Sequence, residues 1–263
     1  MSRFPIKIKN AYWSYGDQKV LNGITLSIQK GMFYSVIGPN GSGKTTLLKN
    51  IGHILSPMKN TIFLEEQDIT TFSRKQIAQN LAIVPQNTEI DFSFTVFDII
   101  MMGRTPYLKR FQGESPEDKQ IVEDAMKSTN TWSLRNKKID ELSGGERQRV
   151  IMARAIAQKT DILLLDEPIS HLDIQHQIEL MGLIKQLNQQ KQITVIAVLH
   201  DLNIAAEYSD TIILLHKGSI FAMDTPNKVL IPEYIHQVYG VNVDIIKNPI
   251  THKPHIIPIY ADG

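Results

Sequence analysis

Two short segments of the sequence contain residues that could bind a phosphate group. The first, GPNGSGKTT at residues 38–46, combines spaced glycines with a lysine and two threonines. The second, DELSGGERQRV at residues 140–150, has two adjacent glycines before a basic run that favours a helix. Backbone N–H groups in glycine-rich turns and at helix N-termini attract anions, so both segments are candidates. A single phosphate chain would not satisfy both, because each segment would hold the same terminal phosphate.

The first segment matches the P-loop pattern, and it lies between an apolar run and the helix-like stretch TTLLKNI. Its glycines let the backbone curl around phosphate, Lys44 supplies a charge for the β- and γ-phosphates, and Thr45 offers a hydroxyl to Mg²⁺. An ordinary glycine turn is the alternative, which the flanking strand and helix disfavour. The nucleotide-binding residues predicted here are Asn40, Gly41, Ser42, Gly43, Lys44, Thr45 and Thr46.

Polar side chains also follow three apolar runs that have the composition of buried strands. They are Asp166 and Glu167 after ILLL, His200 after TVIAVL, and Gln86 after AIVP. Ligands of parallel α/β sheets bind beyond the carboxyl ends of the strands, so we expect these side chains near the phosphates. Asp166 is a candidate Mg²⁺ ligand, Glu167 a candidate base toward water, and His200 a candidate γ-phosphate contact. Gln86 could contact the metal or the water, although any one of these residues alone could be a solvated strand end.

The second segment has the pattern of a capped helix. Ser143 and Glu146 have the spacing of a capping box, with Glu146 at the third helical position. A well-capped helix start is therefore one interpretation of the segment. However, Gly144 and Gly145 leave their N–H groups uncovered, and such a helix N-terminus attracts anions. A second copy of the chain would resolve the competition with the P-loop, since its nucleotide could bind here.

The elements that must position these residues alternate along the chain. PIKIKN and ITLSI have the period of half-buried strands and predict an antiparallel β subdomain near the N-terminus. Helix-length stretches separate most of the later strand-like segments, which predicts an α/β fold with a mostly parallel sheet core. These segments are the continuous apolar runs at residues 33–38, 81–85, 161–166, 194–199 and 211–215.

No strand-like run occurs between residues 87 and 161. In that interval SPEDKQIVEDAMKST has Ser115 as a candidate N-cap and Pro116 at the first helical position. We therefore predict an inserted α-helical subdomain within a single domain. The predicted parts are a catalytic core with the β subdomain at 1–89 and 158–225, the helical subdomain at 90–157, and a tail at 226–263 that is too short for a second domain.

Composition and charge narrow the possible classes. The chain has 263 residues, 42% of them hydrophobic, a formal net charge of +1 and no cysteine. This excludes disulfides and thiol catalysis and gives no indication of nucleic acid as a partner. The start MSRFPIKIKN lacks the apolar stretch of a secretory signal, and the longest apolar runs fall far short of the ~18 residues of a membrane helix. We expect a soluble chain that another chain would have to hold at a membrane.

Two further features each have a structural and a functional interpretation. Tyr15 lies in the turn-like stretch SYGDQKVL, where it could stack on a base or serve the fold alone. His252 and His255 in THKPH lack carboxylate or cysteine support, so loop residues are favoured over metal ligands.

Taken together, the motifs resemble those of the nucleotide-binding subunits of ABC transporters, which have a P-loop NTPase (RecA-like) core. The resemblance covers nearly the whole chain. It rests on the P-loop Gly38–Thr45, the Q-loop Gln86, the signature LSGGERQ (142–148), the strand ILLLDE with Asp166 and Glu167, the D-loop SHLD (170–173) and the switch His200. Six motifs in this order are highly specific.

The resemblance implies a head-to-tail homodimer that sandwiches two ATP molecules with Mg²⁺. Each ATP would lie between the P-loop of one subunit and residues 143–146 of the other, which would explain the two phosphate-binding segments. The resemblance also assigns adenine stacking to Tyr15 and communication across the dimer to Asp173. The helical subdomain and the segment after Gln86 would contact polytopic membrane permease subunits, at the cytoplasmic face of the cell membrane.

Three segments point to a subfamily. FTVFDIIMMGRTPYL (94–108), SHLDI (170–174) and YGVNV (239–243) resemble subunits of importers for iron–siderophore complexes, haem, cobalamin and related metal chelates. The resemblance to these importers also implies a substrate-binding protein as an indirect partner of the chain. Ile169 and His171 depart from the residues common in the family at those positions.

Three alternatives stay open. The first is an importer for another metal or an oxyanion. The second is a non-transport ABC ATPase that acts on DNA or ribosomes. The third is a small-molecule kinase, which would leave LSGGERQ without a role.

Overall fold

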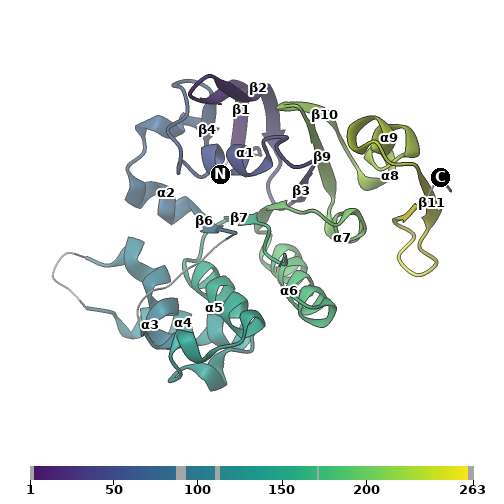
Figure 1. Cartoon of the computed structure of the whole chain (residues 1–263). Helices are drawn as coiled ribbons and strands as arrows, with labels where there is room; N and C mark the ends of the chain where they lie inside the picture. Colours follow the sequence, from purple (N-terminus) through teal and green to yellow (C-terminus); the bar gives the residue numbers. More distant parts are fainter. Residues whose placement is uncertain (1–2, 87–92, 110–112, 171, 260–263) are drawn as a thin grey trace. The chain divides into compact units, whose positions relative to one another are not determined.

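The computed structural model describes residues 3–86, 93–109, 113–170 and 172–259. It divides into two compact units, one formed by Met1–Thr71 with Thr194–Gly263 and the other by Phe72–Ile193. Figure 1 shows the helices and strands of each unit. The two units are described in turn.

The first unit begins with an antiparallel sheet. Apolar and polar residues alternate at the start of its first strand, and Ile6 and Ile8 are buried. Gly16, with a φ of 56°, lies in the tight turn between the first two strands. The strand order is β2-β1-β4-β5, with β1 at Ile6–Tyr15, β2 at Gln18–Ile28, β4 at Ile62–Leu64 and β5 at Gln67–Asp68. This sheet confirms the predicted N-terminal antiparallel β subdomain.

Mostly parallel strands form the buried core of the same unit. β3 pairs in parallel with β8 and β9, and β10 pairs antiparallel with β9. Every residue of β3 and β8 is buried, which explains why both are continuous apolar runs in the sequence. The bounds are β3 Phe33–Ile37, β8 Thr194–Val198, β9 Thr211–His216 and β10 Ser219–Asp224, with helices α1 Lys44–Ile51 and α7 Leu202–Tyr208 and the 3₁₀ turn η1 Ile69–Thr71.

The C-terminal tail forms regular secondary structure in the first unit, although the sequence analysis predicted no helix or strand there. It forms α8 (Pro226–Val229), α9 (Pro232–Tyr239) and a hairpin of β11 (Val243–Lys247) and β12 (Pro254–Pro258). α9 packs against β11, and α7 packs against β12. His252 lies in the turn of this hairpin and His255 on β12. Among the described residues no group of three or more His, Asp or Glu side chains could hold a metal.

The second unit combines two parallel strands with a group of helices. β6 (Leu81–Val84) pairs with β7 (Ile162–Asp166), and among the described residues between them the chain forms helices rather than strands. α3, α4 and α5 pack against one another (Figure 1). The helix bounds are α2 Arg74–Asn80, α3 Val96–Met101, η2 Met102–Tyr107, α4 Pro116–Ser128, η3 Trp132–Leu134, η4 Ile139–Glu141, α5 Gly144–Ala157 and α6 Ile174–Lys191. The parallel pairs in both units confirm the predicted α/β class.

Helix α4 begins where the sequence predicts. The Ser115 hydroxyl accepts a hydrogen bond from the Asp118 N–H, and the Asp118 carboxylate accepts one from the Ser115 N–H, so a capping box starts the helix. This second unit extends beyond the predicted helical subdomain, because it also includes β6, β7 and α6. That the residues 90–157 work as a separate functional part stays a prediction.

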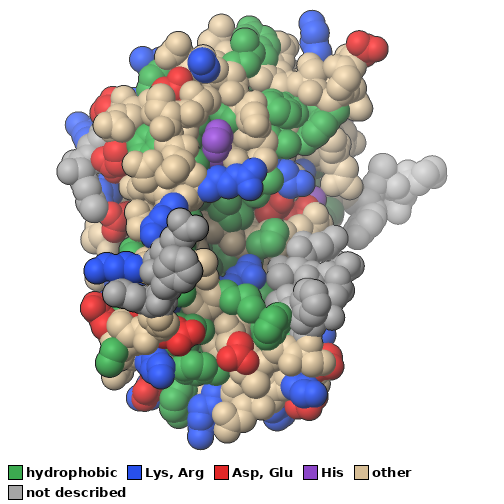
Figure 2. Space-filling view, turned by 90° about the vertical axis from the view of Figure 1, so that its left-hand side faces the viewer, with side chains coloured by type: hydrophobic (Ala, Val, Ile, Leu, Met, Phe, Trp, Pro, Cys, Tyr) green, Lys and Arg blue, Asp and Glu red, His purple; other side chains and the backbone are tan. Residues whose placement is uncertain are grey.

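Charged side chains of both signs are interspersed on the face that Figure 2 shows. The whole sequence has 28 lysines and arginines against 27 aspartates and glutamates. Within the described ranges, every helix is too short or too polar to cross a membrane.

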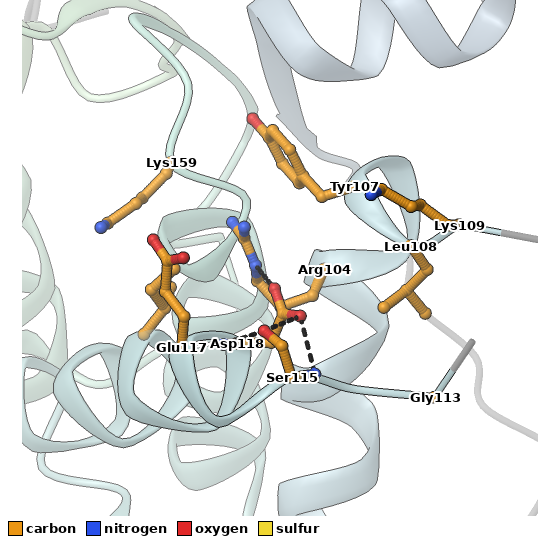
Figure 3. A pocket seen from close by; sticks show the side chains of 10 residues that line it. Arg104, Tyr107, Leu108, Lys109, Gly113, Ser115, Glu117, Asp118 and Lys159 are labelled. Carbon is orange, nitrogen blue, oxygen red and sulfur yellow. Dashed lines mark hydrogen bonds and ion pairs between the residues drawn. The ribbon is translucent and has the colours of Figure 1, made fainter.

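A buried ion pair joins α4 to η2 in the second unit. The Arg104 guanidinium Nε donates to Asp118 Oδ1 at 2.9 Å, its Nη1 donates to the Ala157 carbonyl at 2.8 Å, and the guanidinium lies 4.1 Å from the Tyr107 ring. Figure 3 shows these side chains at the wall of a cavity of about 620 Å³. The hydrogen bond from Arg104 lowers the pKa of the Asp118 carboxyl. The pair therefore stabilises the helices around it only while Asp118 is ionised.

The variant Asp118→Asn is expected to lower the free energy of unfolding by about 3 kcal/mol at neutral pH, because it leaves a buried arginine without its anion. A depressed pKa contributes stability that is complete above the ordinary carboxyl pKa of 3.8 and is lost as the pH falls through the native value. Urea unfolding should thus show a constant gap between wild type and variant above about pH 5 that narrows only in stronger acid. A gap that closes already between neutral pH and about pH 5 would contradict this account.

Candidate functional site

A glycine-rich loop connects β3 to α1 in the first unit. Gly38, Gly41 and Gly43 have φ values of 149°, 78° and 100°, which disfavour any residue with a Cβ. At Gly38 a Cβ would also lie 2.3 Å from the Leu215 carbonyl oxygen, whereas at Gly41 it would meet open space. The loop is therefore packed against the sheet at its start and uncovered at its middle, where a phosphate could approach the backbone.

Lys44 is buried at the start of α1, with 6% of its surface exposed. Its Nζ donates to the carbonyls of Gly38 and Pro39 at 2.8 and 3.0 Å, so the loop folds around the ammonium group. The buried Ser42 hydroxyl has no hydrogen-bond partner among the described residues. A buried cation and a hydroxyl left to bond are the groups that phosphate oxygens would satisfy. The residues present thus fit a bound nucleotide phosphate.

Other predicted residues of the first unit lie at the ends of strands. Tyr15 ends β1 with 48% of its surface exposed, and its ring lies edge-on to Trp13 with 6.1 Å between centroids. An aromatic face that is half uncovered can accept a base by stacking. His200 follows β8, and the next residue, Asp201, caps α7 by accepting hydrogen bonds from the N–H groups of Asn203 and Ile204 at 2.7 and 3.0 Å.

The second unit brings Gln86 and Glu167 together at the carboxyl ends of β6 and β7. Gln86 Nε2 donates to Glu167 Oε2 at 2.7 Å. Glu167 has a φ of 52°, a left-handed conformation that costs energy in a residue other than glycine and that occurs often at functional sites. Asp166, directly before it, has 4% of its surface exposed. β7 thus ends with the buried carboxylate of Asp166. It is followed by Glu167, which has a strained backbone and a carboxylate that the Gln86 amide binds.

The N-terminus of α5 is formed by the second candidate segment. The Ser143 hydroxyl accepts from the Glu146 N–H at 3.3 Å, and Glu146 Oε2 accepts from the Ser143 N–H at 2.9 Å. These two bonds form the predicted capping box, and the Ser143 N–H lowers the pKa of the Glu146 carboxyl. Apart from its chain neighbours and the backbone of its own helix, no described atom lies within 4 Å of the position that a Cβ on Gly144 would take. The helix is both capped and open at its first residue.

A histidine that the sequence analysis did not single out lies beside this helix start. The His176 ring is 3.3 Å from the position of a Cβ on Gly145. Asp173, the N-cap of α6, accepts from the His176 N–H at 2.9 Å and lies 2.7 Å from its ring Nδ1. The His176 N–H lowers the pKa of the Asp173 carboxyl. The only signal in the sequence is the spacing of three residues between Asp173 and His176.

The predicted site residues divide between the two units. The first contains Tyr15, Asn40, Gly41, Ser42, Gly43, Lys44, Thr45, Thr46 and His200; the second contains Gln86, Ser143, Gly144, Gly145, Glu146, Asp166, Glu167 and Asp173. Ile169 is buried. His171 and the segment directly after Gln86 lie outside the described residues.

Comparison with known proteins identifies the family. Residues 21–170 match the family model described as ABC transporter. The chain belongs to the ABC transporter family. Its relatives include the achromobactin transport ATP-binding protein of Dickeya dadantii, 38% identical over 93% of this chain and 91% of that protein. The ferric enterobactin transport ATP-binding protein of Escherichia coli is 37% identical over 93% and 90%, and the iron(3+)-hydroxamate import ATP-binding protein of Bacillus subtilis 38% over 91% and 89%.

Solved ABC transporter structures have the same fold. A structure assigned to the metal-chelate type, in an inward-facing conformation, matches with a TM-score of 0.86 at 26% identity over 98% of both chains. The dimeric cassette MJ0796, bound to ADP and Pi, matches with a TM-score of 0.73 at 28% identity over 84% of this chain and 98% of that one. These matches confirm the predicted fold and family. The chain is an ABC ATPase subunit that binds ATP.

The two glycines Gly38 and Gly41 provide a matched pair for testing the loop geometry. Gly38→Ala is expected to lower the free energy of unfolding by about 3 kcal/mol or more, because left-handed strain adds to the clash with Leu215. Gly41→Ala meets open space and should lose only the strain, about 1–2 kcal/mol. Urea unfolding followed by circular dichroism measures both. Equal losses would mean that Gly38 is not packed as the structure has it.

Proposed function

We propose that two copies of this chain sandwich two ATP molecules and hydrolyse them to power an importer. The observation that carries the proposal is the uncovered N-terminus of α5 in a chain that already has a P-loop. Beyond its chain neighbours and its own helix, no described part of the chain covers the position of a side chain on Gly144, so another molecule can reach the backbone there. The γ-phosphate bound at the P-loop of one copy would be held by Ser143–Glu146 of the other. A dimeric cassette among the structural relatives supports this arrangement.

Hydrolysis in this proposal depends on several of the predicted site residues. Thr45, Asp166 and Gln86 would supply oxygen ligands to Mg²⁺, which neutralises phosphate charge when bound. The Gln86 amide contacts Glu167 through its nitrogen, and its oxygen is the atom that can act as a ligand of Mg²⁺. Glu167 would orient the attacking water and take its proton, and His200 would contact the γ-phosphate. Tyr15 would stack on the adenine, and Asp173 would relay the state of one copy to the other.

The dimer would act at the cytoplasmic face of the cell membrane on polytopic membrane permease subunits, with a substrate-binding protein as an indirect partner. Relatives that transport achromobactin, ferric enterobactin and iron(3+)-hydroxamates support an iron–siderophore or related chelate as the cargo. Uptake of ⁵⁵Fe-labelled ferric chelates by cells with and without this gene tests the cargo. Unchanged uptake of each chelate would leave ATP hydrolysis in place but refute this cargo class.

Glu167→Gln is expected to keep ATP affinity and to lower kcat by about 10²–10⁴-fold, because the water loses its base. The variant should then accumulate as a nucleotide-bound dimer, since only the closed form makes the second set of phosphate contacts. Light scattering with Mg-ATP measures this. A variant that stays monomeric at saturating ATP would refute the sandwich.

Gly144→Leu is expected to keep the fold and the affinity of the monomer for ATP but to lower turnover by about 10²-fold or more, because a side chain would stand where the phosphate of the other copy approaches. Gly182→Leu is the matched control, since Gly182 also lies in a helix of the second unit with open space around it. Steady-state phosphate release compares the two. Equal rates in both variants would show that the start of α5 is only a cap.

A further inference from the structure

We infer that the C-terminal hairpin, β11–β12, positions His200 for catalysis by holding helix α7 in place. The inference rests on the proposed role of His200 at the γ-phosphate. It assigns a function that no motif of the sequence indicates to the tail, through Lys253, and to Asn203 of α7.

Asn203 joins the first turn of α7 to the hairpin. Its side-chain Nδ2 donates to the Ile256 carbonyl at 3.3 Å, and its Oδ1 accepts from the Ile256 N–H at 2.7 Å. Both backbone groups of one β12 residue are therefore bonded to a single amide. The N–H of Asn203 donates in turn to Asp201, the residue directly after His200. Two hydrogen-bonded steps thus connect β12 to the residue next to His200.

Lys253 holds the other end of the same helix. Its Nζ donates to the carbonyls of Glu207 and Ser209 at 2.8 and 3.2 Å, and these belong to the last turn of α7 and the residue that ends it. A cation there satisfies carbonyls that have no partner within the helix and complements the helix dipole. The Thr251 hydroxyl adds a bond to the Glu207 carboxylate at 2.8 Å. The hairpin is therefore bonded to both ends of α7.

Such support is needed because α7 has only seven residues. A helix of this length does not form by itself, because the hydrogen bonds of two turns do not offset the free energy of nucleating the helix. His200 lies between β8, whose continuation at Leu199 donates to the Val36 carbonyl at 3.2 Å, and the cap of α7. Its backbone is fixed on one side by the sheet and on the other by a helix that the hairpin holds. Loss of the hairpin contacts would weaken the support of His200 on the α7 side, where packing of α7 against β3 and α8 would remain, and small misplacements of a catalytic group reduce rates strongly.

The test compares Asn203→Ala and Lys253→Met with Lys247→Met. Lys247 lies on the same hairpin, is exposed, and has a side chain without a hydrogen bond to the described residues. We expect kcat for ATP to fall by about 10-fold in the first two variants, with KM and the affinity for a fluorescent ATP analogue unchanged. Lys253→Arg should retain the wild-type kcat, and so should Lys247→Met.

A double-mutant cycle separates positioning from general damage to the fold. If the hairpin acts through His200, Asn203→Ala will lower kcat no further in a His200→Ala background, measured as single-turnover phosphate release. The inference is overturned if Asn203→Ala and Lys253→Met both have the wild-type kcat. It is equally overturned if Asn203→Ala or Lys253→Met lowers kcat by the same factor in both backgrounds, or if ATP affinity falls together with kcat. A wild-type protein that binds ATP but does not hydrolyse it would instead refute the proposed function.

Discussion

Phosphate that is bound by backbone N–H groups requires a chain without side chains at the point of approach. Much of this molecule follows from that constraint. Gly38 lets the first loop lie close to Leu215 of β9, Gly43 lets it lie close to β2, and Gly41 leaves its middle open. Gly144 leaves the start of α5 open in the same way. Because glycine weakens any element it interrupts, each exposed backbone stretch needs support from residues around it. Lys44 provides this support in the loop, and the capping box of Ser143 and Glu146 provides it at α5.

The two carboxylates at the end of β7 are positioned by strand pairing and, for Glu167, by a hydrogen bond from a side-chain amide. Strand pairing places Gln86 beside Glu167, and the hydrogen bond between them fixes a side chain whose own backbone is strained. Glu167 has a left-handed backbone and so departs from the extended conformation of the strand. Asp166 is the last residue of β7 and is buried. Two adjacent acids therefore lie in different surroundings, as the proposed division of roles between Asp166 at the metal and Glu167 at the water requires.

Most of the fold could be predicted from local patterns. The buried strands are continuous apolar runs. The capping box of α5 can be identified in the sequence, and so can the N-cap and the first-turn proline of α4. The contact of Gln86 with Glu167 follows from the rule that parallel strands present their carboxyl ends at one edge. The short strands β4 and β5 could not be predicted in this way, because three and two residues are too few to show a period.

The contacts that sequence reasoning missed have a common physical character. His176 lies beside Gly145 from another helix, and Asn203 and Lys253 bond to backbone groups about 50 residues away. A hydrogen bond from a side chain to a distant backbone group leaves no periodicity and sets no residue type at the receiving end. Ile256 could be any residue with an N–H and a carbonyl, so nothing in its identity records the contact. Motifs therefore reveal the groups that would contact the nucleotide, while the groups that hold them in position become visible only once the backbone has been folded.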